Sequence, residues 1–167
     1  MTDTESPLVS AGMRARRGIW SEWSPYCAGI APSDIRRWAI ATYRPEEPPR
    51  IYWDEDYARA TRWGGIVAPV EFNPFAWSLP SASRRATRCR EIDAADLVRP
   101  RRVNGGCRMR FGVRMRPGDR VRRRSRLEGW TVKEGRAGDI LLVDFAHEWR
   151  NDRDESVRDA TFTLIYT

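Results

Sequence analysis

The second half of the chain alternates hydrophobic and polar positions. In "RMRFGVRMRPGD", which begins at Arg108, apolar residues at every second position are separated mainly by arginines. A period of two places one set of side chains on the buried face of a β-strand. Three further segments, "RVRRRSRLEGW", "ILLVDFAHEWRN" and "SVRDATFTLIYT", have strand character, and "RPGD" has the composition of a tight turn. The pattern predicts a meander of four antiparallel strands from residue 101 onward.

The first half of the chain has helical spacing instead. "APSDIRRWAIATY", residues 31–43, places apolar residues on one helical face, with Ser33 as a candidate N-cap. A second short helix is predicted over residues 54–63, with Asp54 as its cap and the pair Gly64–Gly65 as its end. A third, "APVEFNPFAWSL", is apolar enough to be buried and would begin near Pro69. Helices followed by strands predict an α+β domain whose antiparallel sheet wraps around a central helix.

Composition limits the class of protein. The chain has 167 residues, enough for one hydrophobic core, and no apolar run approaches the roughly 20 residues needed to cross a bilayer. The first segment, residues 1–13, is polar and lacks the pattern of a signal peptide, so we expect a flexible tail before one domain over residues 14–167. Three scattered cysteines predict reduced thiols, no metal site and a cytoplasmic protein.

The charge is positive and is carried by arginine. The formal net charge is +7, Lys133 is the only lysine, and residues 99–126 hold twelve arginines against one acid, Asp119. The alternating arginines are explained most simply as the solvent face of a strand. They would also suit an anionic partner, such as phosphates, an acidic carrier protein or nucleic acid. The sequence contains no recognisable nucleic-acid-binding motif, which argues against the last of these.

Several short motifs occur in an order typical of one known family. The pieces are "SDIRRWAIAT", "PRIYWDEDYA", "GGIVAP", "VNGG", "RPGDRV", "GRAGDILLV" and "FTLIYT". Together they resemble the MaoC-like hydratases and dehydratases, most closely the N-terminal-half, fatty-acid-synthase-like dehydratase domain. The resemblance implies a hot-dog fold, the pairing of two such folds, and an acyl thioester of coenzyme A or an acyl carrier protein between them. It implies no other cofactor. The family's chemistry is addition of water to an enoyl thioester, or its removal from a 3-hydroxyacyl thioester.

The motif that carries this chemistry is altered here. Where the family has an Asp, then Asn-Pro, then a His, this chain reads "PEEPPRIY". Glu46 or Glu47 falls near the Asp position, and Tyr52 falls at or beside the His position. Because the reference pKa of Tyr is about 10 and that of His about 6.5, a Tyr used as a base at neutral pH starts at a disadvantage of roughly 5 kcal/mol. The only histidine, His147, lies far away on the apolar face of a predicted strand and is expected to be a core residue.

These observations predict an acyl-thioester-binding subunit that pairs with a second hot-dog chain carrying the catalytic Asp and His. A self-sufficient enzyme is the alternative, and Glu47, Tyr52 and Asp54 would then be its acid–base groups. Each has a simpler explanation, as a solvated loop carboxylate, a packing residue and a helix cap respectively. A nucleic-acid-binding protein is a third possibility. The residues expected to contact the thioester and its carrier are Trp63, Gly64, Gly65, Ile66, Val67, Ala68, Arg101, Arg102, Asn104 and Gly105.

Overall fold

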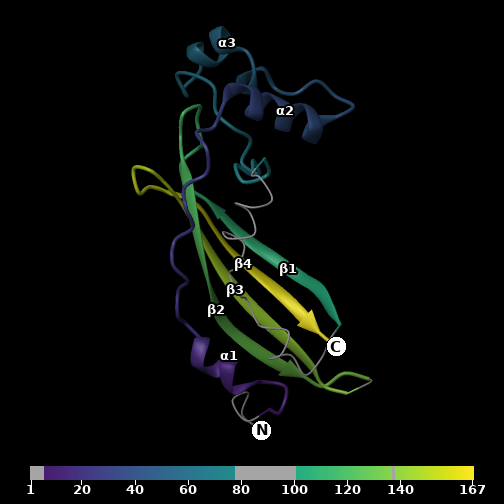
Figure 1. The fold of residues 1–167 in the computed structure, drawn as a ribbon. Coiled ribbons are helices and arrows are strands. Elements are labelled where there is room, and N and C mark those ends of the chain that lie inside the picture. Colours follow the sequence, from purple (N-terminus) through teal and green to yellow (C-terminus); the bar gives the residue numbers. More distant parts are fainter. Residues whose placement is uncertain (1–5, 78–100, 137) are drawn as a thin grey trace.

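The computed structural model describes residues 6–77, 101–136 and 138–167 (Figure 1). Four antiparallel strands form one sheet: β1 (Arg102–Phe111), β2 (Val121–Lys133), β3 (Ile140–Asn151) and β4 (Ser156–Tyr166). Their order across the sheet is β1-β4-β3-β2. The α+β class and the four strands are therefore confirmed, but the simple meander is wrong. The "RPGD" turn joins β1 and β2 without pairing them, and these two strands lie at opposite edges of the sheet.

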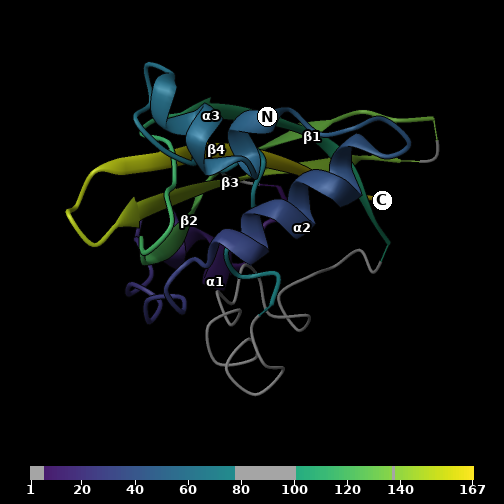
Figure 2. The same cartoon turned by 90° about the horizontal axis from the view of Figure 1, so that it is seen from above.

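Three short helices occupy the ends of the sheet. Figure 1 shows α2 (Pro32–Tyr43) and α3 (Glu55–Ala60) at one end and α1 (Ala11–Arg16) at the other. Figure 2 views the molecule from the end that carries α2 and α3. A single 3-10 turn, η1 (Arg50–Tyr52), joins α2 to α3.

The two predicted helix starts had different outcomes. Asp54 caps α3, since its Oδ1 accepts the N–H of Tyr57 at 2.9 Å. Ser33 does not cap α2. That helix begins at Pro32, two residues earlier than a Ser33 cap would place it, and the Asp34 side chain accepts the N–H of the N-cap residue Ala31 at 3.2 Å. Pro32 takes the first helical position, for which its fixed φ suits it.

The helix predicted to begin near Pro69 is not found where it was expected. Residues 69–77 form successive turns, and the last two residues of the predicted segment lie outside the described residues. Pro74, within the segment, lacks the N–H that the interior of a helix needs. The Phe72 side chain is nevertheless buried, so the segment contributes to the core without being helical.

The expected flexible tail is packed from Ser6 onward. Leu8, Val9 and Met13 are buried, and the Ser10 hydroxyl caps α1 by accepting the N–H of Met13 at 3.1 Å. Residues 1–5 are polar and led to the tail prediction, although three apolar residues that become buried follow them. The tail prediction is therefore wrong for residues 6–13, because burial of these side chains offsets the cost of ordering the segment.

Two hydrophobic clusters lie on one face of the sheet, here called the inner face. One joins α2, α3 and the 66–72 segment to Trp149 of β3. The other joins α1 and the residues before it to Val143 and Phe145 of the same strand. Because alternate residues of a strand share a face, both clusters pack against the inner face. His147 lies between them, and its ring packs edge-on against Phe162 with centroids 5.0 Å apart.

Residues 18–30, the edge segment, run along the free edge of β2. Every third residue of it, from Gly18 to Ile30, donates a main-chain hydrogen bond of 2.8–3.0 Å to β2 or to Asp119 just before it. The opposite edge of the sheet differs. Among the described residues, β4 alone pairs with β1. Within the described residues, the sheet therefore has one covered edge and one edge without a pairing segment, here called the open edge.

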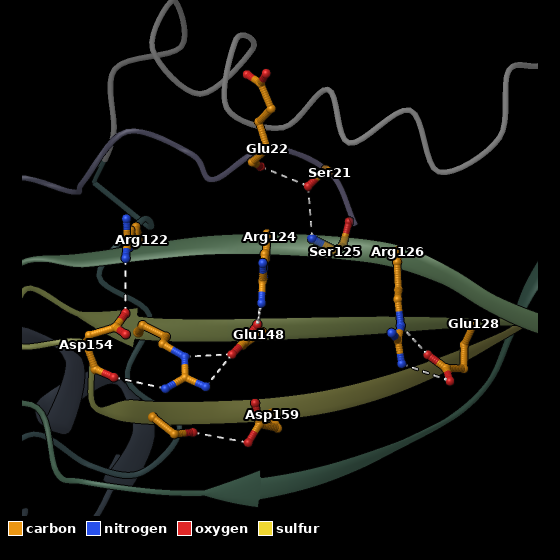
Figure 3. A network of polar contacts seen from close by, with 12 residues as sticks. Ser21, Glu22, Arg122, Arg124, Ser125, Arg126, Glu128, Glu148, Asp154 and Asp159 are labelled. Carbon is orange, nitrogen blue, oxygen red and sulfur yellow. Dashed lines mark hydrogen bonds and ion pairs between the residues drawn. The ribbon is translucent and has the colours of Figure 1, made fainter. Parts of the chain in front are cut away.

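The arginines of β2 are engaged within the fold. Arg124 stacks on Trp20 and Trp23 of the edge segment, with its Cζ 4.6 and 4.4 Å from the ring centroids, and Arg122 stacks on Trp23 at 4.5 Å and Tyr26 at 5.4 Å. Such cation–π contacts fasten the edge segment to the outer face. The same face carries ion pairs (Figure 3): Arg122 with Asp154, Arg124 with Glu148, and Arg126 with Glu128. Much of the local charge is thus balanced internally, which weakens the nucleic-acid interpretation.

Candidate functional site

The predicted Gly64–Gly65 pair forms a turn after α3 and borders an open pocket. Both glycines have positive φ, +64° and +156°, which disfavours any other residue there. A Cβ on either would meet no atom within 4 Å, so each faces open space. With Ile66 they form one wall of a pocket of about 330 Å³. The helix itself ends at Ala60, three residues before the predicted end at residue 63.

The next two predicted residues, Val67 and Ala68, are buried and tied to the sheet. Ala68 donates its N–H to the carbonyl of Met115 at 2.8 Å, and its own carbonyl accepts from the guanidinium of Arg114. Arg114 also lies over the ring of Trp63, 5.6 Å from its centroid. Five consecutive predicted residues plus Trp63 therefore form one continuous segment, fixed in place by a single arginine that sequence reasoning assigned to a solvent face.

Tyr52, the residue near the family's His position, faces another tyrosine. The rings of Tyr43 and Tyr52 have centroids 5.9 Å apart. A hydrogen bond from the Tyr43 hydroxyl to Tyr52 is the main cause that raises the pKa of Tyr43, with burial contributing less. A phenol with a raised pKa stays protonated at neutral pH and can donate a hydrogen bond, but it is a poor base.

Asp54 is fully occupied by structural partners. Its Oδ1 accepts the Tyr57 N–H, and its Oδ2 accepts both Nε and Nη2 of Arg50, at 3.0 and 2.6 Å. The hydrogen bond from Tyr57 and then those from Arg50 lower the pKa of Asp54. Glu47 is exposed in the loop before η1. Within the described residues no hydrogen bond or ion pair joins Glu47, Tyr52 and Asp54, so the structure does not assemble them into one acid–base group.

The second half of the predicted site lies at the far end of the sheet. Arg102 pairs with Tyr166 near the C-terminus, whereas Met115, which contacts Ala68, lies beyond the other end of β1. Ten strand residues at about 3.3 Å each separate these ends by roughly 30 Å. Within one chain, the structure therefore does not bring the predicted arginines and the glycine pair together.

Local packing gives the predicted residues at the start of β1 structural roles. The Asn104 side chain accepts the N–H of Gly106 at 3.0 Å, at a bulge in the strand. A Cβ on Gly105 would lie 2.8 Å from Cγ1 of Ile165, so this glycine is needed for close strand packing. Arg101 and Arg102 are exposed, and the Arg101 carbonyl accepts the N–H of Thr167 at 3.0 Å.

Sequence reasoning missed Arg158, a buried arginine on the inner face. It is 7% exposed, and its Nη2 donates to the carbonyls of Val70 and Phe72 at 2.7 and 3.1 Å. Its guanidinium lies 4.4 Å from the centroid of the Trp149 ring. Burial lowers the pKa of Arg158. In the sequence, Arg158 stands between Val157 and Asp159 in the last predicted strand, and no local pattern marks it as buried. Arg158 and Arg114 together hold the carbonyls of the 68–72 segment.

The sole histidine has no place in this site. Burial, with a smaller contribution from the charge of Arg123, lowers the pKa of His147 to about 4. It is therefore neutral at pH 7 and packed against Phe162 on the inner face. The interpretation of His147 as a core residue agrees with this position. No group of three metal-binding side chains occurs among residues 6–77, 101–136 and 138–167. No helix in the same ranges is long and apolar enough to span a membrane.

Comparisons with known proteins place this geometry in context. The model of the family described as "FAS1-like, dehydratase domain region" matches residues 18–160. No curated protein matches the sequence. Solved structures do: a chain of the ChsH1–ChsH2 complex from Mycobacterium tuberculosis is similar with a TM-score of 0.63 and 19% identity, over 93% of this chain and 87% of that one.

Two further solved structures are similar over most of both chains. The C-terminally truncated HadBC (3R-hydroxyacyl-ACP dehydratase) complex from Mycobacterium tuberculosis gives a TM-score of 0.59 at 19% identity, over 89% of this chain and 96% of that one. A MaoC-like dehydratase from Rhodospirillum rubrum gives 0.57 at 17% identity, over 90% and 91%. At these identities the likeness concerns the fold, and it confirms the single α+β hot-dog fold predicted from the sequence.

Proposed function

The chain belongs to the family of FAS1-like dehydratase domain regions, within the MaoC-like hot-dog hydratases and dehydratases, and on that basis we propose that it is the acyl-thioester-binding subunit of a hydratase or dehydratase. Its substrate would be an enoyl or 3-hydroxyacyl thioester of coenzyme A or an acyl carrier protein. No other cofactor is required for this chemistry. A second hot-dog chain would supply the catalytic Asp and His.

One observation carries this proposal. The predicted binding segment borders an open pocket, whereas the predicted acid–base residues are engaged in structural contacts. Gly64, Gly65 and Ile66 border an open pocket. In contrast, both oxygens of Asp54 are bonded to structural partners, and His147 is half-buried and neutral. A general acid or base needs a free proton site within hydrogen-bond reach of the substrate. The described residues offer binding more readily than turnover.

The open edge of the sheet supports a second chain. The outer edge of β1 lacks a pairing strand within the described residues, while the edge segment occupies the corresponding edge of β2. Val103, Met109 and Phe111 of β1 remain 44, 41 and 44% exposed. An unpaired strand with exposed apolar side chains is a ready surface for strand addition. Two solved structures similar to this chain are named as two-component complexes, ChsH1–ChsH2 and HadBC.

The test separates binding from turnover. The purified chain is titrated with a crotonyl or longer enoyl pantetheine thioester by calorimetry, and hydration is followed at the enoyl absorbance. We expect saturable binding and no measurable hydration by the chain alone, and hydration once a MaoC-like chain with intact Asp and His is added and co-elutes with it. Absence of thioester binding by the chain and by the mixture would refute the proposal.

A self-sufficient enzyme is the second candidate, because Tyr43 and Tyr52 form a hydrogen-bonded pair that could donate to a carbonyl oxygen. If the chain alone hydrates enoyl thioesters, then Glu47→Gln, Tyr52→Phe and Asp54→Asn are measured in turn. A true general acid or base loses at least about tenfold in kcat on replacement. Wild-type rates in all three variants would place the chemistry elsewhere.

A further inference from the structure

Two arginines border the pocket beside the glycine pair, and one of them has no ion-pair partner among the described residues. Arg116 belongs to the "RPGD" turn and Arg59 to α3. The nearest acid in sequence to Arg116, Asp119, already accepts the main-chain N–H of Arg116 at 2.8 Å and the side chain of Arg153 at 3.0 Å. No ion pair is recorded between the Arg116 guanidinium and any described residue. It is a cation beside a cavity with no counter-charge of its own.

The other charges around the pocket do not neutralise it. Arg59 pairs with Asp56 at 2.8 Å, but both side chains are largely exposed, so this pair is weak. Glu55 is the one carboxylate in the described lining. The described lining thus holds two guanidinium groups and one carboxylate, and Asp56 pairs with Arg59 from outside that lining.

The main chain adds donors to these cations. Within the described part of the chain, the N–H groups of Gly65 and Ile66 have no hydrogen-bond acceptor, whereas those of Gly64 and Ala68 do. Ile66 is only 7% exposed as a whole residue, and it lines the pocket. Successive free N–H groups at a turn with positive φ bind anions well. A buried N–H without an acceptor is costly, which favours an anion here.

We propose that this pocket, formed by Gly65, Ile66, Arg59 and Arg116, binds a phosphate ester of the thioester carrier. Guanidinium and main-chain N–H donors together match the three acceptor oxygens of a phosphate. The pocket is open, so the remainder of a carrier can extend from it, and the buried Val67–Ala68 segment follows directly. This inference rests on the proposed function for the identity of the ligand. It places the phosphate contact roughly 30 Å from Arg101 and Arg102.

The first experiment uses the full chain labelled with ¹⁵N and titrated with three ligands. Coenzyme A carries the nucleotide phosphates, 4′-phosphopantetheine carries the phosphate common to coenzyme A and carrier proteins, and pantetheine carries none. We expect saturable shifts of the Gly65 and Ile66 amide signals with coenzyme A and not with pantetheine. Shifts with phosphopantetheine too would identify the shared phosphate, and shifts with coenzyme A alone would identify the nucleotide phosphates.

The second experiment removes the cation. Arg116→Gln should weaken coenzyme A binding about tenfold, as expected for a charge-assisted hydrogen bond. The control, Arg136→Gln, removes the same charge from an exposed position in the loop between β2 and β3 and should bind as the parent does. The loss with Arg116→Gln should shrink at high salt, because exposed charges are screened.

Three results would overturn the phosphate site. These are equal Gly65 and Ile66 shifts with coenzyme A and pantetheine, no shifts up to about 10 mM of either phosphorylated ligand, or equal affinities for Arg116→Gln and Arg136→Gln. The proposed function is tested separately by acyl pantetheine thioesters, which lack phosphate. Loss of the phosphate site with retained acyl pantetheine binding leaves the proposed function standing. Phosphate binding without any acyl thioester binding refutes the proposed function alone.

Discussion

Arg114 donates two hydrogen bonds, from Nε at 3.1 Å and Nη2 at 2.7 Å, to the main-chain carbonyl of Ala68. The two residues are 46 positions apart in the chain. This contact joins the segment after β1 to the last residue of the predicted ligand-binding segment. The alternating sequence pattern suggested that Arg114 faces solvent. The contact shows instead that Arg114 positions the site.

The Arg114–Ala68 contact predicts that Arg114→Gln destabilises the protein and loosens its site. Loss of two charge-assisted hydrogen bonds to a buried carbonyl should lower the free energy of unfolding by about 2 kcal/mol. Binding of acyl pantetheine thioesters should weaken as well. Arg110→Gln, an exposed arginine of β1, is the control and should change neither. Urea unfolding and calorimetry make the comparison, and equal stability of the two variants would contradict this role.

The half-buried His147 predicts a loss of stability in mild acid. The pKa of His147 is about 4 in the folded chain against an ordinary value of 6.5. Between these values the unfolded chain binds more protons, so stability is complete above about pH 6.5 and falls as the pH approaches 4. The difference of about 2.5 pH units corresponds to roughly 3 kcal/mol at most. Urea unfolding from pH 7.5 to 4.5 should show this slope, and His147→Leu should remove it. An unchanged slope in the variant would show that other groups are responsible.

Glu148 predicts a contrast between a buried and an exposed ion pair. Burial alone would raise the pKa of Glu148, but hydrogen bonds from Arg150 and Arg124 outweigh it and hold that pKa below its usual value. Its side chain is 9% exposed, and both arginines lie 2.6 Å away. Glu148→Gln should therefore cost about 2 kcal/mol of unfolding free energy. Asp56→Asn, which breaks the exposed pair with Arg59, should stay within about 0.5 kcal/mol. Thermal and urea unfolding measure both, and similar losses would argue against this difference.

The open edge of β1 predicts a partner with acidic residues. Arg108 and Arg110 are on the outer face of β1 and, within the described chain, have no ion-pair partner. Pairing of two identical chains through β1 in a register that aligns these residues would bring like charges together, which is destabilising. We therefore expect the parent chain to self-associate weakly, and an equimolar mixture with an Arg108→Glu, Arg110→Glu variant to form more dimer.

Light scattering after size exclusion measures the dimer fraction of each sample. A matched control mixture contains an Arg36→Glu, Arg37→Glu variant, whose charge change lies on the exposed face of α2. It should behave as the parent alone. A mixture of parent and β1 variant that elutes as the parent alone would show that β1 does not form the contact.

The sequence alone determined the elements whose signals are local. The period-two segments gave all four strands, Asp54 capped α3, and the motif series led to the correct family and fold. These features depend on side-chain alternation, capping chemistry and residue order, all of which can be read from neighbouring residues in the sequence. The order of the strands was not local. Nothing in "RPGD" reveals that β1 pairs with β4, because strand pairing depends on long-range packing rather than on the connecting turn.

The site depended even more on tertiary structure. Three arginines that belong to similar alternating patterns in the sequence have three different roles. Arg110 faces solvent, Arg114 binds a main-chain carbonyl, and Arg158 is buried against an aromatic ring. Only the folded chain distinguishes them, because each role is set by a partner far away in sequence. The same holds for the separation of Arg101 from the glycine pair. The sequence motifs predicted that Arg101 and the glycine pair belong to one site. The length of β1 places them at opposite ends of the sheet.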